Sequence, residues 1–125
     1  MVNQDVHPDF ILKSCQEVEP KEAAFKGVYP KGALWLFLQN QKKKQINEEN
    51  IKYIKTIQLP THGELFDFMY QADPNYLGKD WLITLAEYEG KIYKIVTEIH
   101  VVVKIDEGDS PSSSCYEPTL LKVKK

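Results

Sequence analysis

Three titratable side chains lie close together where the pattern predicts the start of a helix. His62, Glu64 and Asp67 would share its first turns, and a histidine beside a carboxylate can act as a general base. A structural role already explains Glu64, because Thr61 and Glu64 have the spacing of a capping box and an acid suits the first helical turn. We therefore expect no catalytic residue here, and a small enzyme with a histidine in a pocket is the third hypothesis.

Glu98 and His100 alternate along a predicted strand, so both point to the same side, about 7 Å apart at Cα. With a third ligand they could bind zinc, but the chain has no HxxxH, no HExxH and no cysteine pair at finger spacing. We interpret them as a solvent-facing ion pair and expect neither metal nor cofactor. The same face carries Ile92, Val96 and Val102, and such a half-apolar face needs a covering helix or a partner.

The two cysteines, Cys15 and Cys115, show neither a disulfide framework nor an activated thiol. Free thiols are favoured, with a bridge between them as the alternative. Cys15 is predicted on a helix without a nearby activating group, which favours a core position over catalysis. The N-terminus lacks the segments of a signal peptide, and the apolar run 33–38 is too short to cross a bilayer. We therefore expect a cytoplasmic protein without membrane contact.

Lys42, Lys43 and Lys44 form a basic cluster that could contact phosphates, with Tyr53 near enough in sequence to stack a base. The acids at 48–49 dilute this cluster, the formal net charge of the chain is −2, and charge runs in loops are usually only solvated. Single glycines without GxGxxG or a Walker-type loop exclude nucleotide binding by that route. Nucleic-acid binding through the lysine loop is the second hypothesis.

The composition is that of an ordinary globular protein. The chain has 125 residues, of which 42% are hydrophobic and 27% charged, and it is rich in aromatic residues. A chain of this length can form one domain with its own core, and a disordered chain would lack the aromatics. We predict a single compact α+β domain over residues 1–105 and a flexible Ser- and Pro-containing tail over residues 106–125.

Local patterns predict two helices and a mostly antiparallel sheet of about four strands. Proline and apolar spacing predict a helix at about 8–18, and a second helix begins at Thr61 and ends at 73–75. The run 33–38 is apolar on both alternating faces, which predicts a central strand. Residues 51–59 favour a strand over a helix, narrowly.

The clearest pattern is a hairpin over 80–105, whose arms flank Glu89-Gly90. A two-residue loop would pair Leu85 with Lys94 and mix core with surface, so we predict a three-residue loop at 88–90. That register gathers six apolar residues on one face: Trp81, Ile83, Leu85, Tyr93, Ile95 and Ile99. The second arm is long, which predicts a bend or bulge near 98–101.

These observations favour a non-enzymatic protein-binding module, such as a small inhibitor, immunity or accessory protein, over an enzyme. The absence of catalytic chemistry, the small size and a sheet face that mixes aliphatic and charged groups support this hypothesis. If exposed, Trp81, Tyr88 and Tyr93 would be its anchors, because aromatic residues dominate interface hot spots. Glu98 and His100, on the same sheet, are further candidates for binding the partner. The partner is expected to be another protein.

Overall fold

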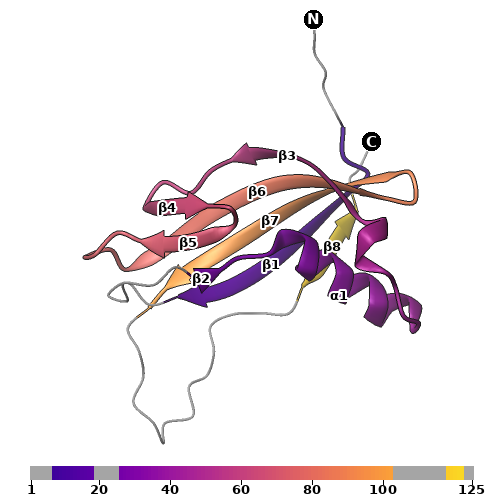
Figure 1. The fold of residues 1–125 in the computed structure, drawn as a ribbon, viewed down its shortest axis with the longest axis horizontal. Helices are drawn as coiled ribbons and strands as arrows, with labels where there is room; N and C mark the ends of the chain where they lie inside the picture. The colour runs from indigo at the N-terminus through magenta and orange to yellow at the C-terminus, as the bar shows by residue number, and fades with distance from the viewer. Residues whose placement is uncertain (1–6, 19–25, 103–117, 123–125) are drawn as a thin grey trace, which may run out of the picture.

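In a computed structural model, which describes residues 7–18, 26–102 and 118–122, the chain adopts an α+β fold dominated by sheet (Figure 1). The predicted class is confirmed, but the prediction of about four mostly antiparallel strands and two helices is not: the described residues form one α-helix, a mixed five-stranded sheet and a three-stranded sheet. No helix among them is long and apolar enough to cross a membrane. The elements are β1 (Phe10–Val18), β2 (Lys26–Gly27), α1 (Pro30–Lys42), the 3-10 helix η1 (Glu48–Asn50), β3 (Lys52–Gln58), β4 (Gly63–Phe66), β5 (Met69–Ala72), β6 (Gly78–Tyr88), β7 (Lys91–Val101) and β8 (Thr119–Lys122).

The large sheet has the strand order β3-β6-β7-β1-β8. β1 runs parallel to β7, whereas the other neighbouring strands are antiparallel. A parallel pair needs a long connection, and the chain between β1 and β7 contains α1 and the small sheet, of order β2-β5-β4. This connection therefore supplies the layers that cover one face. β8 lies within the segment 106–125 predicted as a tail, most of which lies outside the described residues, so that division stays a prediction.

The predicted hairpin over 80–105 is confirmed as β6 and β7, but its predicted loop is wrong. The loop has two residues, Glu89 and Gly90, whose φ angles of 53° and 79° both lie in the left-handed region of a type I′ turn. Leu85 consequently pairs with Lys94, the register that the sequence argument rejected. A turn of this type matches the twist of the two strands, and this match decides the register.

The two-residue loop divides the six grouped apolar residues between the two faces of the sheet. We call the face that packs against α1 and the small sheet the inner face, and the opposite one the outer face. Tyr93, Ile95 and Ile99 lie on the inner face, which also takes two buried threonines, Thr84 and Thr97. The remaining three of the set alternate with the inner positions of β6 and lie on the outer face, where Leu85 is nevertheless buried: Trp81, Ile83 and Leu85. The β6–β7 register is continuous, so of the predicted bend or bulge near 98–101 the bulge is wrong, and the register shifts occur between β3 and β6 instead.

Residues 33–38, predicted as a central strand, lie in helix α1. Pro30 occupies the first helical turn, where its missing N–H needs no partner. Leu34 and Leu38 follow one turn apart and are buried against the sheet. Lys43 ends the helix in the left-handed conformation, with a φ of 56°. The apolar run alone fits a strand and a helix equally well, and the proline with the leucine spacing selects the helix.

Residues 8–18, predicted as a helix, contain strand β1. Leu12, Ser14 and Val18 are buried on the inner face. The odd-numbered residues of the strand point to the outer face. Ser14 hides this period of two, because a polar residue at an inner position breaks the apolar alternation. The ladder with β7 then satisfies the backbone N–H and C=O groups that a helix would have satisfied internally.

The helix predicted to begin at Thr61 is also wrong, and this segment forms the β4–β5 hairpin. Asp67 and Phe68 make its turn with φ angles of 52° and 61°. The backbone N–H groups of Thr61 and His62 donate to the carboxylate of Asp80, at 2.9 and 2.8 Å. Long-range hydrogen bonds therefore replace the helical cap that the local pattern predicted. Residues 51–59, by contrast, contain the predicted strand as β3.

The inner face carries two separate clusters of buried apolar side chains. One lies under α1 and includes Leu34, and the other lies under the small sheet and includes Tyr70. Figure 1 shows the two covering elements toward opposite ends of the long strands. Between the clusters, β1, β6 and β7 each contribute one buried hydroxyl residue: Ser14, Thr84 and Thr97. The core is thus interrupted by a row of three hydroxyl groups, which we call the hydroxyl row.

Candidate functional site

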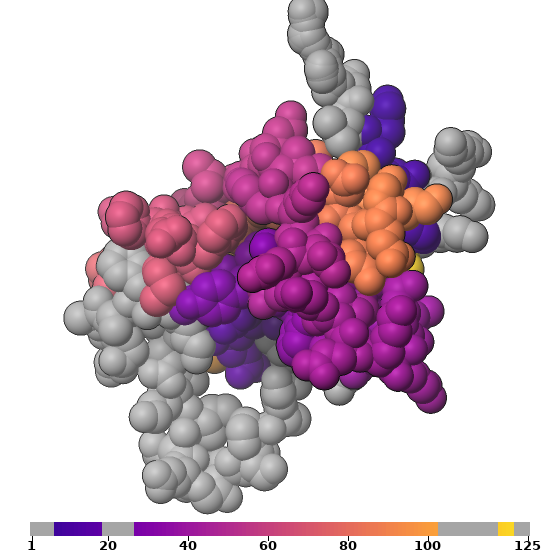
Figure 2. All heavy atoms as spheres, turned by 45° about the vertical axis from the view of Figure 1, so that its right-hand side comes forward, coloured from indigo at the N-terminus to yellow at the C-terminus, as the bar shows by residue number. Residues whose placement is uncertain are grey.

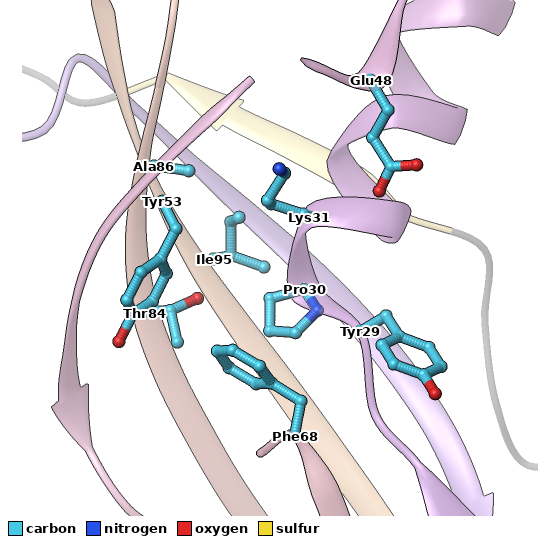
Figure 3. A pocket seen from close by; sticks show the side chains of 9 residues that line it. All are labelled: Tyr29, Pro30, Lys31, Glu48, Tyr53, Phe68, Thr84, Ala86 and Ile95. Atoms are coloured by element: carbon cyan, nitrogen blue, oxygen red, sulfur yellow. The ribbon is translucent and has the colours of Figure 1, made fainter. Parts of the chain in front are cut away.

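A cavity of about 180 Å³ opens over the inner face, where the start of α1, strand β3 and the β4–β5 turn meet (Figure 3). An apolar cavity of roughly 150 Å³ can hold benzene, so this one has room for a single ring. It is smaller than the pockets of about 300–1,000 Å³ that take drug-sized ligands. We call it the ring pocket, and its lining residues are Tyr29, Pro30, Lys31, Glu48, Tyr53, Phe68, Thr84, Ala86 and Ile95.

Aromatic side chains form the walls of the ring pocket. Tyr53 of β3 and Phe68 of the β4–β5 turn meet edge to face, with ring centroids 5.5 Å apart and an interplanar angle of 83°. Tyr29 precedes α1, and Pro30 lies between it and the sheet (Figure 3). Phe68 has a left-handed backbone, with a φ of 61°, and its ring faces the pocket (Figure 3). Three segments far apart in the sequence therefore supply rigid apolar walls.

The floor of the ring pocket belongs to the sheet and contains one unsatisfied polar group. Thr84 is 1% exposed, and its Oγ1 has no hydrogen-bond partner among the residues that the structure describes. Figure 3 shows this oxygen turned into the space that Ile95, Pro30 and Phe68 surround. A buried hydroxyl left unpaired costs about 1–3 kcal/mol. The pocket thus offers a ligand one hydrogen-bonding position within an apolar enclosure.

The opening of the ring pocket carries opposite charges. Lys31 of α1 and Glu48 of η1 both line it, and Figure 3 shows them at its helical side. Asn47 caps η1 by accepting a hydrogen bond from the N–H of Glu49, at 2.9 Å, which fixes the turn that carries Glu48. The two charges cancel in sum, so the rim selects neither an anion nor a cation. This favours an uncharged ring as the ligand.

A second group of chemically capable side chains lies on the outer face. Cys15 of β1 is the ladder partner of Glu98 on β7, and His100 follows two residues later on the same strand. His100 Nε2 lies 2.9 Å from Glu98 Oε1 and 3.6 Å from Cys15 Sγ. The sequence correctly predicted that Glu98 and His100 share a side and contact each other. The prediction that this pair faces solvent is wrong, because the two side chains are only 16% and 8% exposed.

Cys15 differs from its predicted state in two ways. It lies in a strand rather than a helix, and its sulfur is in a disulfide, so the expectation of a free thiol is wrong for this residue. The other cysteine of the chain, Cys115, lies outside the described residues. Sequence reasoning had no access to the closeness of Cys15 and His100, because it depends on the pairing of two strands far apart in the chain.

The structure separates the three aromatic residues predicted as anchors. Trp81 is 38% exposed on the outer face, opposite Glu98 on the neighbouring strand. Tyr88 and Tyr93 are buried in the cluster under α1, so neither can serve as an exposed anchor. Phe10 stacks on Tyr93 with ring centroids 5.1 Å apart, and burial raises the pKa of the Tyr93 hydroxyl. Only Trp81 is accessible to a partner in the way we predicted.

The lysine cluster and Tyr53 do not form one surface. Tyr53 lines the ring pocket beside the first turn of α1, whereas Lys42 and Lys43 lie at the opposite end of that helix, about 18 Å along its axis. Lys42 Nζ lies 4.0 Å from Glu89 Oε1 at the tip of the β6–β7 hairpin. The space-filling view shows the α1 segment against this tip (Figure 2). Lys44 is exposed in the loop that follows.

His62 takes part in packing instead of in a catalytic group. Its ring stacks on Tyr76 at a centroid distance of 3.9 Å with an interplanar angle of 2°. Glu64 is exposed on β4, and Asp67 is exposed in the turn that follows. Neither His62 nor His100 lines the ring pocket.

Sequence analysis overlooked Thr84, Phe68 and Pro30 as site residues and assigned Tyr53 to a different site. A signal for Thr84 was present, since it is the one hydroxyl in the otherwise apolar run 81–86. Nothing local indicated Phe68, because the loop that carries it was expected to be helical. Comparison with known proteins supplies no further guide: no family model, no curated protein and no solved structure matches the chain.

Proposed function

We propose that the chain is a small non-enzymatic protein-binding module, and that its ring pocket receives one tyrosine side chain of the partner protein. A phenol has the size of the cavity and carries one hydroxyl, which can exchange a hydrogen bond with Thr84 Oγ1. The unsatisfied Thr84 hydroxyl on the pocket floor is the observation that carries this proposal. A purely apolar ligand would leave it unpaired.

The surroundings of the opening favour a protein over a free small molecule. Large apolar residues stay exposed before α1 and on strands β3 and β4: Tyr29 at 60%, Tyr53 at 44%, Ile57 at 49% and Phe66 at 74%. A free phenol would fill the cavity but leave these side chains in water. A protein that inserts a tyrosine would also cover them, and an aromatic anchor within an apolar surround is typical of interface hot spots.

The lining side chains also argue against catalysis in this pocket. Among the residues that the structure describes, they include no histidine and no cysteine, which often act as base or nucleophile in enzymes. Lys31 and Glu48 lie at the rim, while the floor offers only a neutral hydroxyl. Binding is the chemistry that this arrangement supports.

Amide NMR titrations with N-acetyltyrosine amide and N-acetylphenylalanine amide test the proposal. We expect shifts at Phe68, Thr84 and Ile95, and a preference for the tyrosine compound of about fivefold, which corresponds to one net hydrogen bond of about 1 kcal/mol. Thr84→Val should remove this preference. Thr97→Val is the matched control, because this buried threonine lies in the hydroxyl row but does not line the pocket, and it should keep the preference.

Peptides displayed on phage and selected on the protein distinguish a protein partner from a free ligand. Selected peptides should share a tyrosine, and p-cresol should compete with them. Binding of p-cresol without any tyrosine peptide would reject the protein partner. No shift at the pocket residues with either amino-acid amide would reject the pocket itself.

A further inference from the structure

We propose that Cys15, Glu98 and His100 bind Zn²⁺ when Cys15 is a thiol. Thiolate, carboxylate and imidazole are all zinc ligands, and three protein ligands leave the fourth position of a tetrahedral site for water. One ligand atom from each of the three lies within 4.8 Å of the other two. This site lies on the outer face of the sheet and is independent of the ring pocket.

The distances between the ligand atoms fit a tetrahedral ion. Zn–S and Zn–N bonds of about 2.3 and 2.05 Å place sulfur and nitrogen about 3.5 Å apart at a tetrahedral angle. Cys15 Sγ and His100 Nε2 are 3.6 Å apart. Glu98 Oε1 lies 2.9 Å from the same nitrogen and would need to move by only a few tenths of an ångström. Both neighbours therefore already point at the nitrogen atom that would hold the metal.

The sheet provides a rigid support for these three ligands. Cys15 and Glu98 are directly opposite on the parallel β1–β7 ladder, and His100 is on the same side as Glu98 because side chains alternate along a strand. Lys79 Nζ lies 3.8 Å from Glu98 Oε2, the carboxylate oxygen that does not contact the histidine. Such an outer contact orients a ligating carboxylate while its other oxygen faces the metal.

Reduction would make the site available. A dithiol converts the disulfide of Cys15 into two thiols and is itself oxidised to a cyclic disulfide. Binding of Zn²⁺ then displaces the proton of the Cys15 thiol to solvent, because only the thiolate is a ligand. In the bound state the thiolate and the Glu98 carboxylate neutralise the two charges of the ion. Metal binding would consequently depend on the redox state of the chain.

Cobalt titration tests this proposal, with the full chain reduced by dithiothreitol and desalted without oxygen. One equivalent of Co²⁺ should give the intense visible bands of a tetrahedral ion and a near-ultraviolet sulfur-to-cobalt band, and Zn²⁺ should abolish both. The indole of Trp81, opposite Glu98, should be quenched by the bound cobalt. The oxidised chain should show none of these signals.

Variants assign the ligands. Cys15→Ser should remove the sulfur-to-cobalt band, and His100→Gln should weaken binding by more than the about 10- to 100-fold that loss of an outer contact costs. Cys115→Ser is the matched control, since it keeps the three ligands and removes the only other cysteine of the sequence, so Cys15 should stay a thiol and bind cobalt without any reductant. Circular dichroism checks that each variant is folded. An octahedral spectrum in the reduced chain and in Cys115→Ser, or a sulfur band that persists in Cys15→Ser, would overturn the proposal.

Discussion

Asp80 is a buried carboxylate that ties the loop after β3 to strand β6, and its replacement by asparagine should destabilise the fold strongly. It is 1% exposed. Oδ1 accepts from the N–H groups of Thr61 and Trp81, at 2.9 and 3.0 Å. Oδ2 accepts from the N–H of His62 and the hydroxyl of Tyr70, both at 2.8 Å. All four donors therefore point at one side chain.

Asp80→Asn keeps the shape but turns one acceptor oxygen into a donor. The less costly orientation turns the new amide group toward Tyr70, whose hydroxyl can then accept, and leaves the N–H of His62 without an acceptor. That orphaned donor costs about 1–3 kcal/mol, and the two bonds to the remaining oxygen lose about 1 kcal/mol each as they become neutral. The expected loss is about 3–5 kcal/mol, a large share of a typical stability of about 5–15 kcal/mol.

Urea unfolding measures this loss, and native-state amide exchange locates it. We expect faster exchange at His62 in particular, since its N–H is the donor that loses its acceptor. Asp73→Asn is the control, because Asp73 is exposed and exposed substitutions usually change stability by less than about 0.5 kcal/mol. If Asp80→Asn costs no more than this control, or if exchange at His62 is unchanged, the carboxylate does not stabilise the loop as argued.

Three further predictions concern the core and the hairpin. Thr84→Val should raise the unfolding free energy of the ligand-free protein by about 1 kcal/mol, because it removes an unpaired buried hydroxyl, whereas Thr97→Val, which loses a hydrogen bond, should lower it; urea unfolding compares them. Burial raises the pKa of Tyr70 and Tyr93 above the model-compound value of 10.0, so the folded state holds these protons more tightly than the unfolded chain. The contribution of these two protonated hydroxyls to the free energy of unfolding is complete below about pH 10. Above that pH the free energy of unfolding should fall by up to about 1.4 kcal/mol per pH unit for each tyrosine, and equal urea midpoints at about pH 9 and 11 would contradict this. Gly90→Ala should cost about 1 kcal/mol in calorimetry through its φ of 79° alone, since a Cβ there would contact nothing within 4 Å.

Sequence alone located the β6–β7 hairpin, because Glu89-Gly90 between two strand-like arms is a strong local signal. It failed on the register, which was chosen by counting apolar residues on one face. Thr84 is buried at a position that this count treated as surface. A period-two pattern therefore identifies strands but misplaces their faces wherever hydroxyl residues enter a core.

Two segments were predicted with the wrong type of secondary structure, and this error has a different physical cause. Residues 33–38 and 8–18 are short apolar segments that fit either structure, so the outcome depends on what they pack against. β1 is a strand because β7 lies beside it, and the hydrogen bond from Ser14 to Thr97 joins residues 83 positions apart. The same pairing places Cys15 beside His100. Alternation predicted that Glu98 and His100 are close, but the third member of the group needed the tertiary structure.

The hydroxyl row explains why the ring pocket has one unsatisfied polar group on its floor. At one end, Ser14 donates to Thr97 at 3.4 Å within the core, so these hydroxyls satisfy each other. At the other end, Thr84 pairs across the strands with Ile95, which has no polar side-chain atom, and with Thr56, whose hydroxyl is hydrogen-bonded to Tyr53. Under the proposed function, a tyrosine hydroxyl that enters the ring pocket recovers the free energy that the Thr84 hydroxyl loses by burial. Because α1 and the β4–β5 hairpin cover opposite ends of the sheet, the ring pocket lies between them with Thr84 on its floor, which is why an unpaired hydroxyl there lines a pocket instead of closed core.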